Sequence, residues 1–497
     1  MTTVRRIPLR RAVRWLLLVV ALALAVRFLY WGQPQPRAFT LVPVQPGQWR
    51  ITHDGNPGEV WQAFDVDDDG VLDRFVTPDG EWTRPSRRHR PPRRWLVVCI
   101  DAVPFGVMEE LWQRGHFREF HRPSALVSTF PSDSELAIAA ALHAPPGPGY
   151  EHQYFDRAAN RLRGGVFVTL SGRSIPYLPR FDYVAPGWHK SVQYVLVRRA
   201  WHAEMGRLRQ RFRETQKPVF HAHVSSGDPL FHRLPRAEAQ SLLIEFEHVI
   251  REAYYAGRGE LGVLLWSDHG NSLVRSRSVP LDALLHARGW RRSDALRAPR
   301  DVVIPAYGLV GFFVAYCAPE AVAELAADLS RLEGAELVLY RGPEPNVAVL
   351  LGTGGRRARL RWNDAGTHYR YEPEQGDPIE LEPVLAALAA AGRLDAEGWV
   401  ADADLFAATA RARLPDAVAR IRTWAGTTQV ENPSDIVVSL KPGYYQGRGW
   451  FDRLVTMEGT HGALERDSSL GFAMGTDPLP ETLRLRDLLP AELQPRN

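Results

Sequence analysis

Three apolar segments of the sequence each run into an aspartate, and this pattern constrains the fold more than any other feature. The segments are Trp95–Ile100, Pro218–Val224 and Gly262–Trp266, followed by Asp101, Asp228 and Asp268. Short apolar runs bounded by polar residues are typical of buried strands in a parallel sheet, and helical patterns separate them here as in α/β proteins. Because ligands bind beyond the carboxyl ends of such strands, we expect the three carboxylates to share one edge of one sheet.

Histidines accompany these carboxylates along the chain. Asp228 begins an Asp-x-x-x-His step, a second aspartate is followed directly by histidine, and a late histidine lies in a Gly-flanked loop; the histidines are His232, His269 and His461. Three carboxylates at one edge repel one another unless cations neutralise them. Carboxylate and imidazole ligands without thiolates suit a catalytic zinc site.

Taken in order, these motifs resemble those of the alkaline phosphatase superfamily, in its type I phosphodiesterase/nucleotide pyrophosphatase branch. The matching elements are Asp101, Asp228 with His232, Ser267-Asp268-His269-Gly270 and Gly459-Thr460-His461-Gly462, over roughly residues 95–280 and 430–475. The resemblance implies two divalent metal ions, usually zinc. By that mapping, one metal takes Asp228, His232 and His461, and the other takes Asp101, Asp268, His269 and the oxygen of the nucleophile.

The nucleophile of the resembled family is a hydroxyl at a helix start, after a Phe-Pro step. That frame places it at Ser134, where a helix is predicted from about Ser134 to Leu142. A hydroxyl in the first turn would lie where backbone N–H groups and the helix dipole favour a phosphoryl group. Thr129 and Ser132 are the alternative nucleophiles. A further alternative is that Ser134 serves only as the N-cap of this helix.

The sequence divides into five predicted parts. They are 1–37, a signal anchor and linker; 38–94, a small β-rich segment and basic linker; 95–280, the first part of a catalytic α/β core; 281–430, an inserted cap domain; and 431–497, the second part of the core. The expected fold is an alkaline-phosphatase-like three-layer sandwich with a mostly parallel central sheet. We expect residues 432–439 to form another strand of the core sheet.

The N-terminal part has the pattern of a membrane anchor. Arginines precede an apolar run from Trp15 to Val26, and no small-x-small cleavage site follows it. This favours an uncleaved single-pass anchor in the inner (cytoplasmic) membrane, with the catalytic domain in the periplasm; a cleaved signal peptide is the alternative.

An acidic loop lies within the β-rich segment. Asp65, Asp67, Asp69 and Asp73 have the spacing of a short calcium loop, but Val76 stands where an EF-hand needs glutamate. Structural Ca²⁺ and a bare acidic turn both fit this pattern.

Composition and motifs together define the predicted function. A net charge of +4 on 497 residues provides no concentrated basic face, so we expect no nucleic-acid binding. We expect a two-metal phosphodiesterase or phosphatase that acts through a metal-activated Ser134 and a covalent phosphoseryl intermediate. Its substrate would be a small-molecule, lipid or glycan phosphate ester. The alternatives are a phospho-group transferase of the same superfamily and a non-catalytic surface binding module.

Overall fold

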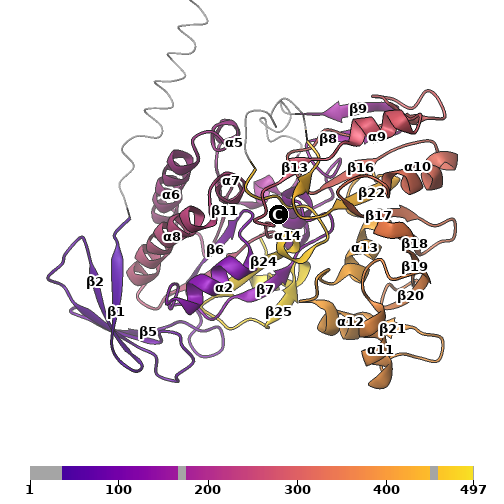
Figure 1. The fold of residues 1–497 in the computed structure, drawn as a ribbon. Helices are drawn as coiled ribbons and strands as arrows, with labels where there is room; N and C mark the ends of the chain where they lie inside the picture. The colour runs from indigo at the N-terminus through magenta and orange to yellow at the C-terminus, as the bar shows by residue number, and fades with distance from the viewer. Residues whose placement is uncertain (1–35, 166–174, 448–456, 496–497) are drawn as a thin grey trace, which may run out of the picture.

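The computed structural model describes residues 36–165, 175–447 and 457–495. Figure 1 shows an N-terminal sheet at one end of the molecule, a central sheet in the middle and a second large sheet at the other end. The predicted signal anchor falls on residues 1–35, outside the described residues. In the described part, every helix is too short or too polar to cross a bilayer.

The N-terminal sheet is an antiparallel meander of five strands in sequence order. The strands are β1 (Phe39–Gln45), β2 (Gln48–His53), β3 (Trp61–Phe64), β4 (Arg74–Thr77) and β5 (Gly80–Thr83). Phe75 stacks on Trp82 with ring centroids 4.0 Å apart, and Trp82 contacts the edge of Tyr254 on helix α8 (Arg236–Ala256). Aromatic packing therefore attaches this sheet to the rest of the molecule.

The basic linker that follows forms ion pairs with the N-terminal segment on one side and with the central domain on the other. Arg84 binds Asp73 at 2.7 Å, and Arg87 binds Asp477 at 2.8 Å. A chain this rich in arginine and proline has no apolar face to bury, so charge pairing fixes its path.

The central sheet has seven strands in the order β10-β11-β6-β12-β24-β7-β25. They are β10 (Tyr183–Val184), β11 (Val219–Val224), β6 (Arg94–Ile100), β12 (Leu261–Trp266), β24 (Leu470–Gly475), β7 (Ser124–Val127) and β25 (Thr482–Arg484). Neighbouring strands are parallel except β24, which is antiparallel to both β12 and β7. The three strands predicted from the sequence are confirmed as β6, β11 and β12, and they lie side by side.

Helices cover both faces of this sheet. Alternate residues of β6 face opposite ways: Leu96 and Val98 pack in one core with helices α2, α6 and α8, whereas Val97 and Cys99 pack in another with helix α3. The helices are α2 (Phe105–Gln113), α3 (Ser134–Ala141) and α6 (Val197–Glu214). The resulting arrangement of helix, sheet and helix is a mixed α/β architecture.

The second seven-stranded sheet has the order β16-β22-β17-β18-β19-β20-β21, and all its neighbouring strands are antiparallel. Its strands are β16 (Phe312–Ala315), β17 (Ala335–Arg341), β18 (Val347–Gly352), β19 (Arg357–Trp362), β20 (His368–Gln375), β21 (Val400–Ala401) and β22 (Ile436–Leu440). The expectation that residues 432–439 supply a strand of the central sheet is wrong. β22 pairs with β16 and β17 in this sheet, where both of its faces are buried.

Short elements complete the described chain. The helices are α5 (Gly187–Val192), α7 (Gly227–Arg233), α9 (Leu281–Ala287), α10 (Val322–Leu329), α11 (Glu382–Ala390), α12 (Asp402–Thr409), α13 (Ala417–Ala425) and α14 (Arg466–Ser469). Three two-stranded pairs are β8 (Gln153–Asp156) with β9 (Arg161–Gly164), β13 (Arg277–Ser278) with β23 (Tyr444–Tyr445), and β14 (Arg291–Arg292) with β15 (Asp301–Val302). The predicted domain boundaries near residues 280 and 430, which set the cap domain apart from the catalytic core, stay a prediction.

Candidate metal centre

The three strand-end aspartates lie at one edge of the central sheet. Asp101 directly follows β6, Asp268 comes two residues after β12, and Asp228 lies in the first turn of α7, just beyond β11. The parallel register aligns the ends of these strands, with Ile100 opposite Val224. Glycine is required where β11 leads into α7, because a Cβ at Gly227 would lie 2.3 Å from the carbonyl oxygen of Asp101. The sequence prediction that the three carboxylates share one edge is confirmed.

The first candidate group consists of Asp228, His232 and His461. Four residues apart, Asp228 and His232 share a face of α7, and Nε2 of His232 lies 2.9 Å from Oδ1 of Asp228. Nε2 of His461 lies 3.5 Å from the same oxygen. Nδ1 of His232 donates to the carbonyl of Gly459 at 2.8 Å, and Nδ1 of His461 donates to the carbonyl of Ser132 at 3.1 Å. Both imidazoles therefore turn Nε2 toward the carboxylate.

The second candidate group consists of Asp101, Asp268 and His269. Nδ1 of His269 donates to the carbonyl of Gly270 at 2.9 Å, and its Nε2 lies 3.3 Å from Oδ2 of Asp268 and 3.7 Å from Oδ1 of Asp101. Oδ1 of Asp268 accepts a hydrogen bond from the backbone N–H of Ala102 at 3.1 Å. Within each group, one ligand atom from every member lies within 4.8 Å of the others.

Ser134 lies at the second group. Its hydroxyl donates to Oδ1 of Asp101 at 3.1 Å, and the same Oγ is 3.1 Å from Nε2 of His269. Helix α3 begins at Ser134, but its N-cap is Asp133, whose carboxylate accepts from the N–H of Glu135. The alternative that Ser134 is only the N-cap is therefore wrong, because Asp133 has that role.

The other two hydroxyls of this segment have structural partners. Oγ1 of Thr129 donates to the carbonyl of Pro131 at 2.8 Å. Ser132 is completely buried, and its hydroxyl bonds the carbonyl of Thr129 at 3.0 Å and receives a hydrogen bond from Arg420 at 2.8 Å. Ser134 is the one of these three hydroxyls that the structure brings to the carboxylate–imidazole groups.

Burial and charge set the protonation of the site. Burial lowers the pKa of His269 to about 4, so its ring is neutral near pH 7. Burial opposes ionisation of Asp228, but the neighbouring His232 and His461 hold the pKa of this carboxyl well below its usual range. Burial likewise opposes a charge on His461, but Asp228 raises the pKa of that ring.

The donor set fits divalent cations. Asp228 Oδ1 and Asp268 Oδ2 are buried and accept no hydrogen bond, although each lies beside a ring nitrogen. A neutral imidazole whose Nδ1 carries the proton presents a lone pair at Nε2. Lone pairs of ring nitrogens and carboxylate oxygens thus face one another. Because such lone pairs repel, a proton or a cation must lie between them. Nitrogen and oxygen donors oriented by backbone carbonyls suit zinc.

Several residues around the groups have no motif in the sequence. The hydroxyl of Tyr194 donates to Oδ2 of Asp228. Glu204 on α6 accepts from the N–H groups of Ser225 and Ser226 at 3.1 and 2.8 Å, which fixes the turn before Asp228. Nε2 of His223, on β11, lies 3.4 Å from Oδ2 of Asp101. Of these residues, only His223 has a recognisable pattern in the sequence, because it and His221 alternate with apolar residues on the strand before Asp228.

The acidic loop forms a separate group in the N-terminal sheet. Its four carboxylates, from Asp65, Asp67, Asp69 and Asp73, lie within 4.8 Å of one another. Asp65 accepts from the N–H groups of Asp69 and Gly70 at 3.1 and 2.8 Å, so the loop also folds as an acidic turn around its own backbone. Calcium at this loop stays a prediction.

The fold and the site define a mixed α/β protein with two adjoining carboxylate–imidazole groups and a serine hydroxyl between members of one of them. No family model and no curated protein matches the chain. Among solved structures, murine ectonucleotide pyrophosphatase/phosphodiesterase 5 is 11% identical with a TM-score of 0.41, over 80% of this chain and 92% of that chain. The human protein of the same name is 10% identical with a TM-score of 0.42, over the same shares.

A second kind of neighbour is phosphonoacetate hydrolase from Sinorhizobium meliloti, solved in complex with phosphonoformate. It is 15% identical with a TM-score of 0.42, over 83% of this chain and 97% of that chain. Likeness at this level does not identify an activity for this chain.

Proposed function

We propose that this chain is a metal-dependent hydrolase of phosphate esters, with the hydroxyl of Ser134 as nucleophile. The observation that carries the proposal is the position of Ser134 Oγ, 3.1 Å from both Asp101 Oδ1 and His269 Nε2. One hydroxyl proton faces two groups that each offer a lone pair. Asp228, His232 and His461 would hold one divalent cation, and Asp101, Asp268, His269 and Ser134 would hold the other.

Two cations bound at these groups would lower the pKa of a coordinated hydroxyl and neutralise charge on the phosphoryl group. Asp101 orients the Ser134 hydroxyl by accepting its hydrogen bond. The start of α3 directs backbone N–H groups toward the region where a phosphoryl group would lie. Attack by Ser134 Oγ forms a bond to phosphorus while the bond to the leaving oxygen breaks, and water then hydrolyses the phosphoseryl group.

Acids around the nucleophile favour a diester over a monoester. Asp133 and Glu135 flank Ser134. Burial and the charges of Glu151 and Glu135 raise the pKa of Asp133 well above its usual range, so the negative charge near the nucleophile comes from these two glutamates and not from Asp133. A doubly charged monoester meets more repulsion beside these acids than a singly charged diester does. Glycan and lipid phosphates remain within this substrate class. The membrane anchor and the periplasmic location stay predictions.

A paired assay tests the proposal. The full chain, purified with zinc, would be given p-nitrophenyl phosphate and bis-p-nitrophenyl phosphate, as wild type, Ser134→Ala and Ser241→Ala. The hydroxyl of Ser241 bonds its own helix, at Ala237, so this variant is the matched control. We expect Ser134→Ala to lower kcat by roughly three orders of magnitude or more at unchanged zinc content, as loss of a nucleophile does. We expect the diester to react faster in the wild type.

Other outcomes have distinct meanings. Full activity of Ser134→Ala would refute the serine mechanism. A zinc-loaded wild type that hydrolyses neither ester would favour the transferase or the binding module. A faster reaction with the monoester would leave the hydrolase in place and overturn the argument from the neighbouring acids.

A further inference from the structure

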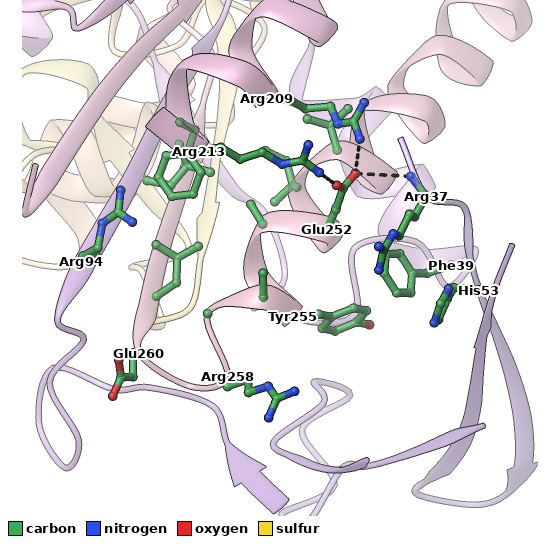
Figure 2. A pocket seen from close by; sticks show the side chains of 18 of the residues that line it. Arg37, Phe39, His53, Arg94, Arg209, Arg213, Glu252, Tyr255, Arg258 and Glu260 are labelled. Atoms are coloured by element: carbon green, nitrogen blue, oxygen red, sulfur yellow. Dashed lines mark hydrogen bonds and ion pairs between the residues drawn. The ribbon is translucent and has the colours of Figure 1, made fainter. Parts of the chain in front are cut away.

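A large cavity lies away from the candidate metal centre, between the N-terminal sheet and the central domain (Figure 2). Its volume is about 870 Å³, and its walls come from the N-terminal sheet, α6, α8 and the start of β6. β6 contributes Arg94 and Leu96 to this cavity, whereas Asp101 follows the other end of the same strand. The cavity and the metal centre therefore lie at opposite edges of the central sheet, about 20 Å apart along β6.

The lining carries more positive than negative charge. Six arginines face four carboxylates; the arginines are 37, 93, 94, 209, 213 and 258, and the acids are Glu59, Asp79, Glu252 and Glu260. Two of the pairs are satisfied at the rim, where Arg258 binds Asp79 at 2.6 Å and Arg93 binds Glu260 at 3.2 Å. Arg94 instead donates to the backbone carbonyl of Thr215 at 2.9 Å, and this hydrogen bond does not neutralise the charge of its guanidinium group.

The excess positive charge is concentrated around the carboxylate of Glu252. This carboxylate binds Arg209 at 2.7 Å and also binds Arg213, and it accepts the backbone N–H of Arg37 at 3.3 Å. Figure 2 shows the guanidinium groups of Arg209 and Arg213 and the backbone nitrogen of Arg37 around this carboxylate. The side chains of Arg209 and Glu252 are only 9% and 11% exposed. Burial and the mutual repulsion of these guanidinium groups lower the pKa of Arg209 and of Arg213.

An aromatic wall lies beside this arginine cluster. Phe39, Trp61 and Tyr255 contact one another, with Tyr255 edge-on to Phe39 at 4.9 Å and to Trp61 at 5.5 Å between ring centroids. Figure 2 shows Phe39 and Tyr255 below Arg37 and Glu252. A pocket with apolar walls and a few convergent charged groups is typical of a small-molecule site.

We propose that this cavity binds an organic anion, in which a phosphate, sulfonate or carboxylate head is joined to an apolar body. Arg209 and Arg213 bind the head, because guanidinium groups match the geometry of such oxyanions and a single carboxylate does not neutralise the cluster. Phe39, Trp61 and Tyr255 contact the apolar body. This is a second ligand site, independent of the candidate metal centre and of the proposed hydrolysis.

Calorimetric titration of the full chain with octane-1-sulfonate tests the proposal, because this anion has no ester bond to hydrolyse. Arg213→Gln removes a largely exposed cation and keeps the Arg209–Glu252 pair, and it should weaken binding about tenfold, the value of a charge-assisted hydrogen bond. Glu252→Gln removes the carboxylate that competes with the anion for Arg209 and Arg213, so it should strengthen binding. Arg211→Gln, on the same helix but lining a different cavity, should leave affinity unchanged.

The opposite responses of the first two variants separate a ligand site from a structural role, since loss of structure would weaken binding in both. Octyl glucoside, which has the tail without the charge, should bind at least tenfold more weakly than the sulfonate. The proposal is overturned if octane-1-sulfonate does not bind, if Arg213→Gln and Arg211→Gln bind it equally well, or if the neutral glucoside binds as tightly.

Discussion

The imidazole rings of His269 and His461 stack with their centroids 4.0 Å apart and their planes 17° from parallel. The two histidines belong to different candidate metal groups and come from distant parts of the chain. Each ring is held by a different backbone carbonyl, Gly270 for one and Ser132 for the other. The two groups therefore adjoin across this stack and are expected to respond as one unit when either ring is removed.

Metal content provides the first prediction. The wild type should bind two equivalents of zinc, measured by elemental analysis after dialysis, and a chelator should abolish hydrolysis and lower Tm, because ligand binding stabilises the folded state. His269→Ala and His461→Ala should each lose metal and activity, and the double variant should lose little further activity, because residues that act as a unit are not additive. The exposed His368 provides the control, His368→Ala. A wild type that retains less than one equivalent would contradict the two-metal site.

The second prediction concerns the hydroxyls near the nucleophile. Ser132→Ala should lower the free energy of unfolding by about 1–3 kcal/mol, because its buried partners lose their hydrogen bonds. Thr129→Val should have a smaller effect, since its hydroxyl bonds only a nearby carbonyl. Both variants should keep zinc and most of kcat/KM, unlike Ser134→Ala. Urea unfolding and ester hydrolysis measure the two quantities, and an inactive but stable Thr129→Val would move the nucleophile to that residue.

Tyr194 gives a prediction on metal affinity. Its hydroxyl donates to Oδ2 of Asp228, which orients the carboxylate. Tyr194→Phe should weaken zinc binding by roughly 10- to 100-fold, as loss of such outer partners does. Tyr444→Phe is the control, because the hydroxyl of Tyr444 bonds the exposed Glu333. Competition with a chromogenic chelator measures the affinity, and equal values for wild type and Tyr194→Phe would remove Tyr194 from the site.

Arg420 gives a prediction on stability. It lies on α13, its guanidinium is buried, and burial lowers its pKa to about 9. It donates to the carbonyls of Thr129, Pro415 and Leu464 and to the hydroxyls of Ser132 and Ser469. Arg420→Met fills a similar volume but leaves these acceptors unpaired, so unfolding free energy should fall by about 3 kcal/mol or more.

The matched control is Arg411→Met, whose side chain is 42% exposed and pairs with Glu481, and it should change stability by less than about 1 kcal/mol. Arg420→Met should also lower kcat more than it raises KM, because the turn before Ser134 loses its support. Equal urea midpoints for the two variants would refute this role.

The last prediction concerns acid stability. The hydrogen bond from Arg291, aided by the backbone N–H groups of Arg297 and Ala298, lowers the pKa of Asp301 to about 2 from an ordinary 3.8. A depressed carboxyl pKa stabilises the folded state above the unfolded pKa, and this contribution is lost as pH falls from about 4 toward 2. Asp301→Asn should therefore lower the urea midpoint at pH 6 and have a shrinking effect below pH 4. A difference that is equal at pH 6 and pH 3.5 would contradict the charge-based cause.

The sequence was sufficient to predict the edge of the sheet on which the candidate site lies. β6 after Arg94 and the whole of β12 are apolar, and β11 is apolar except for His221 and His223. Such near-continuous apolar runs are typical of strands that are buried on both faces. His461 could be assigned to the group of Asp228 and His232 only through the resemblance to a known family. The sequence around His461 does not indicate which strand ends its loop lies beside. The Ser134 frame also came from that resemblance, and the structure places this hydroxyl beside Asp101.

The second sheet could not be predicted in the same way. Residues 382–390 and 402–409 are helical, as their alanine content indicates. The region before them, residues 312–375, is mainly antiparallel strands, and β22 joins these strands by long-range pairing with β16 and β17. The apolar sequence of β22 correctly predicts a buried strand, but this strand is buried in the second sheet and not in the central sheet. The local sequence pattern predicts that β22 is buried. Which sheet it joins depends on strands more than 90 residues away in the sequence, such as β17.

The position of β24 has a consequence for biosynthesis. This strand lies between β12 and β7, inside the central sheet, yet it comes from residues 470–475 of a chain of 497. A ribosome releases the N-terminal parts first, so β6, β11 and β12 emerge long before the strand that separates β12 from β7. His461 emerges with that late strand. A nascent chain that lacks β24, or a chain truncated before His461, therefore has neither a complete central sheet nor a complete pair of carboxylate–imidazole groups.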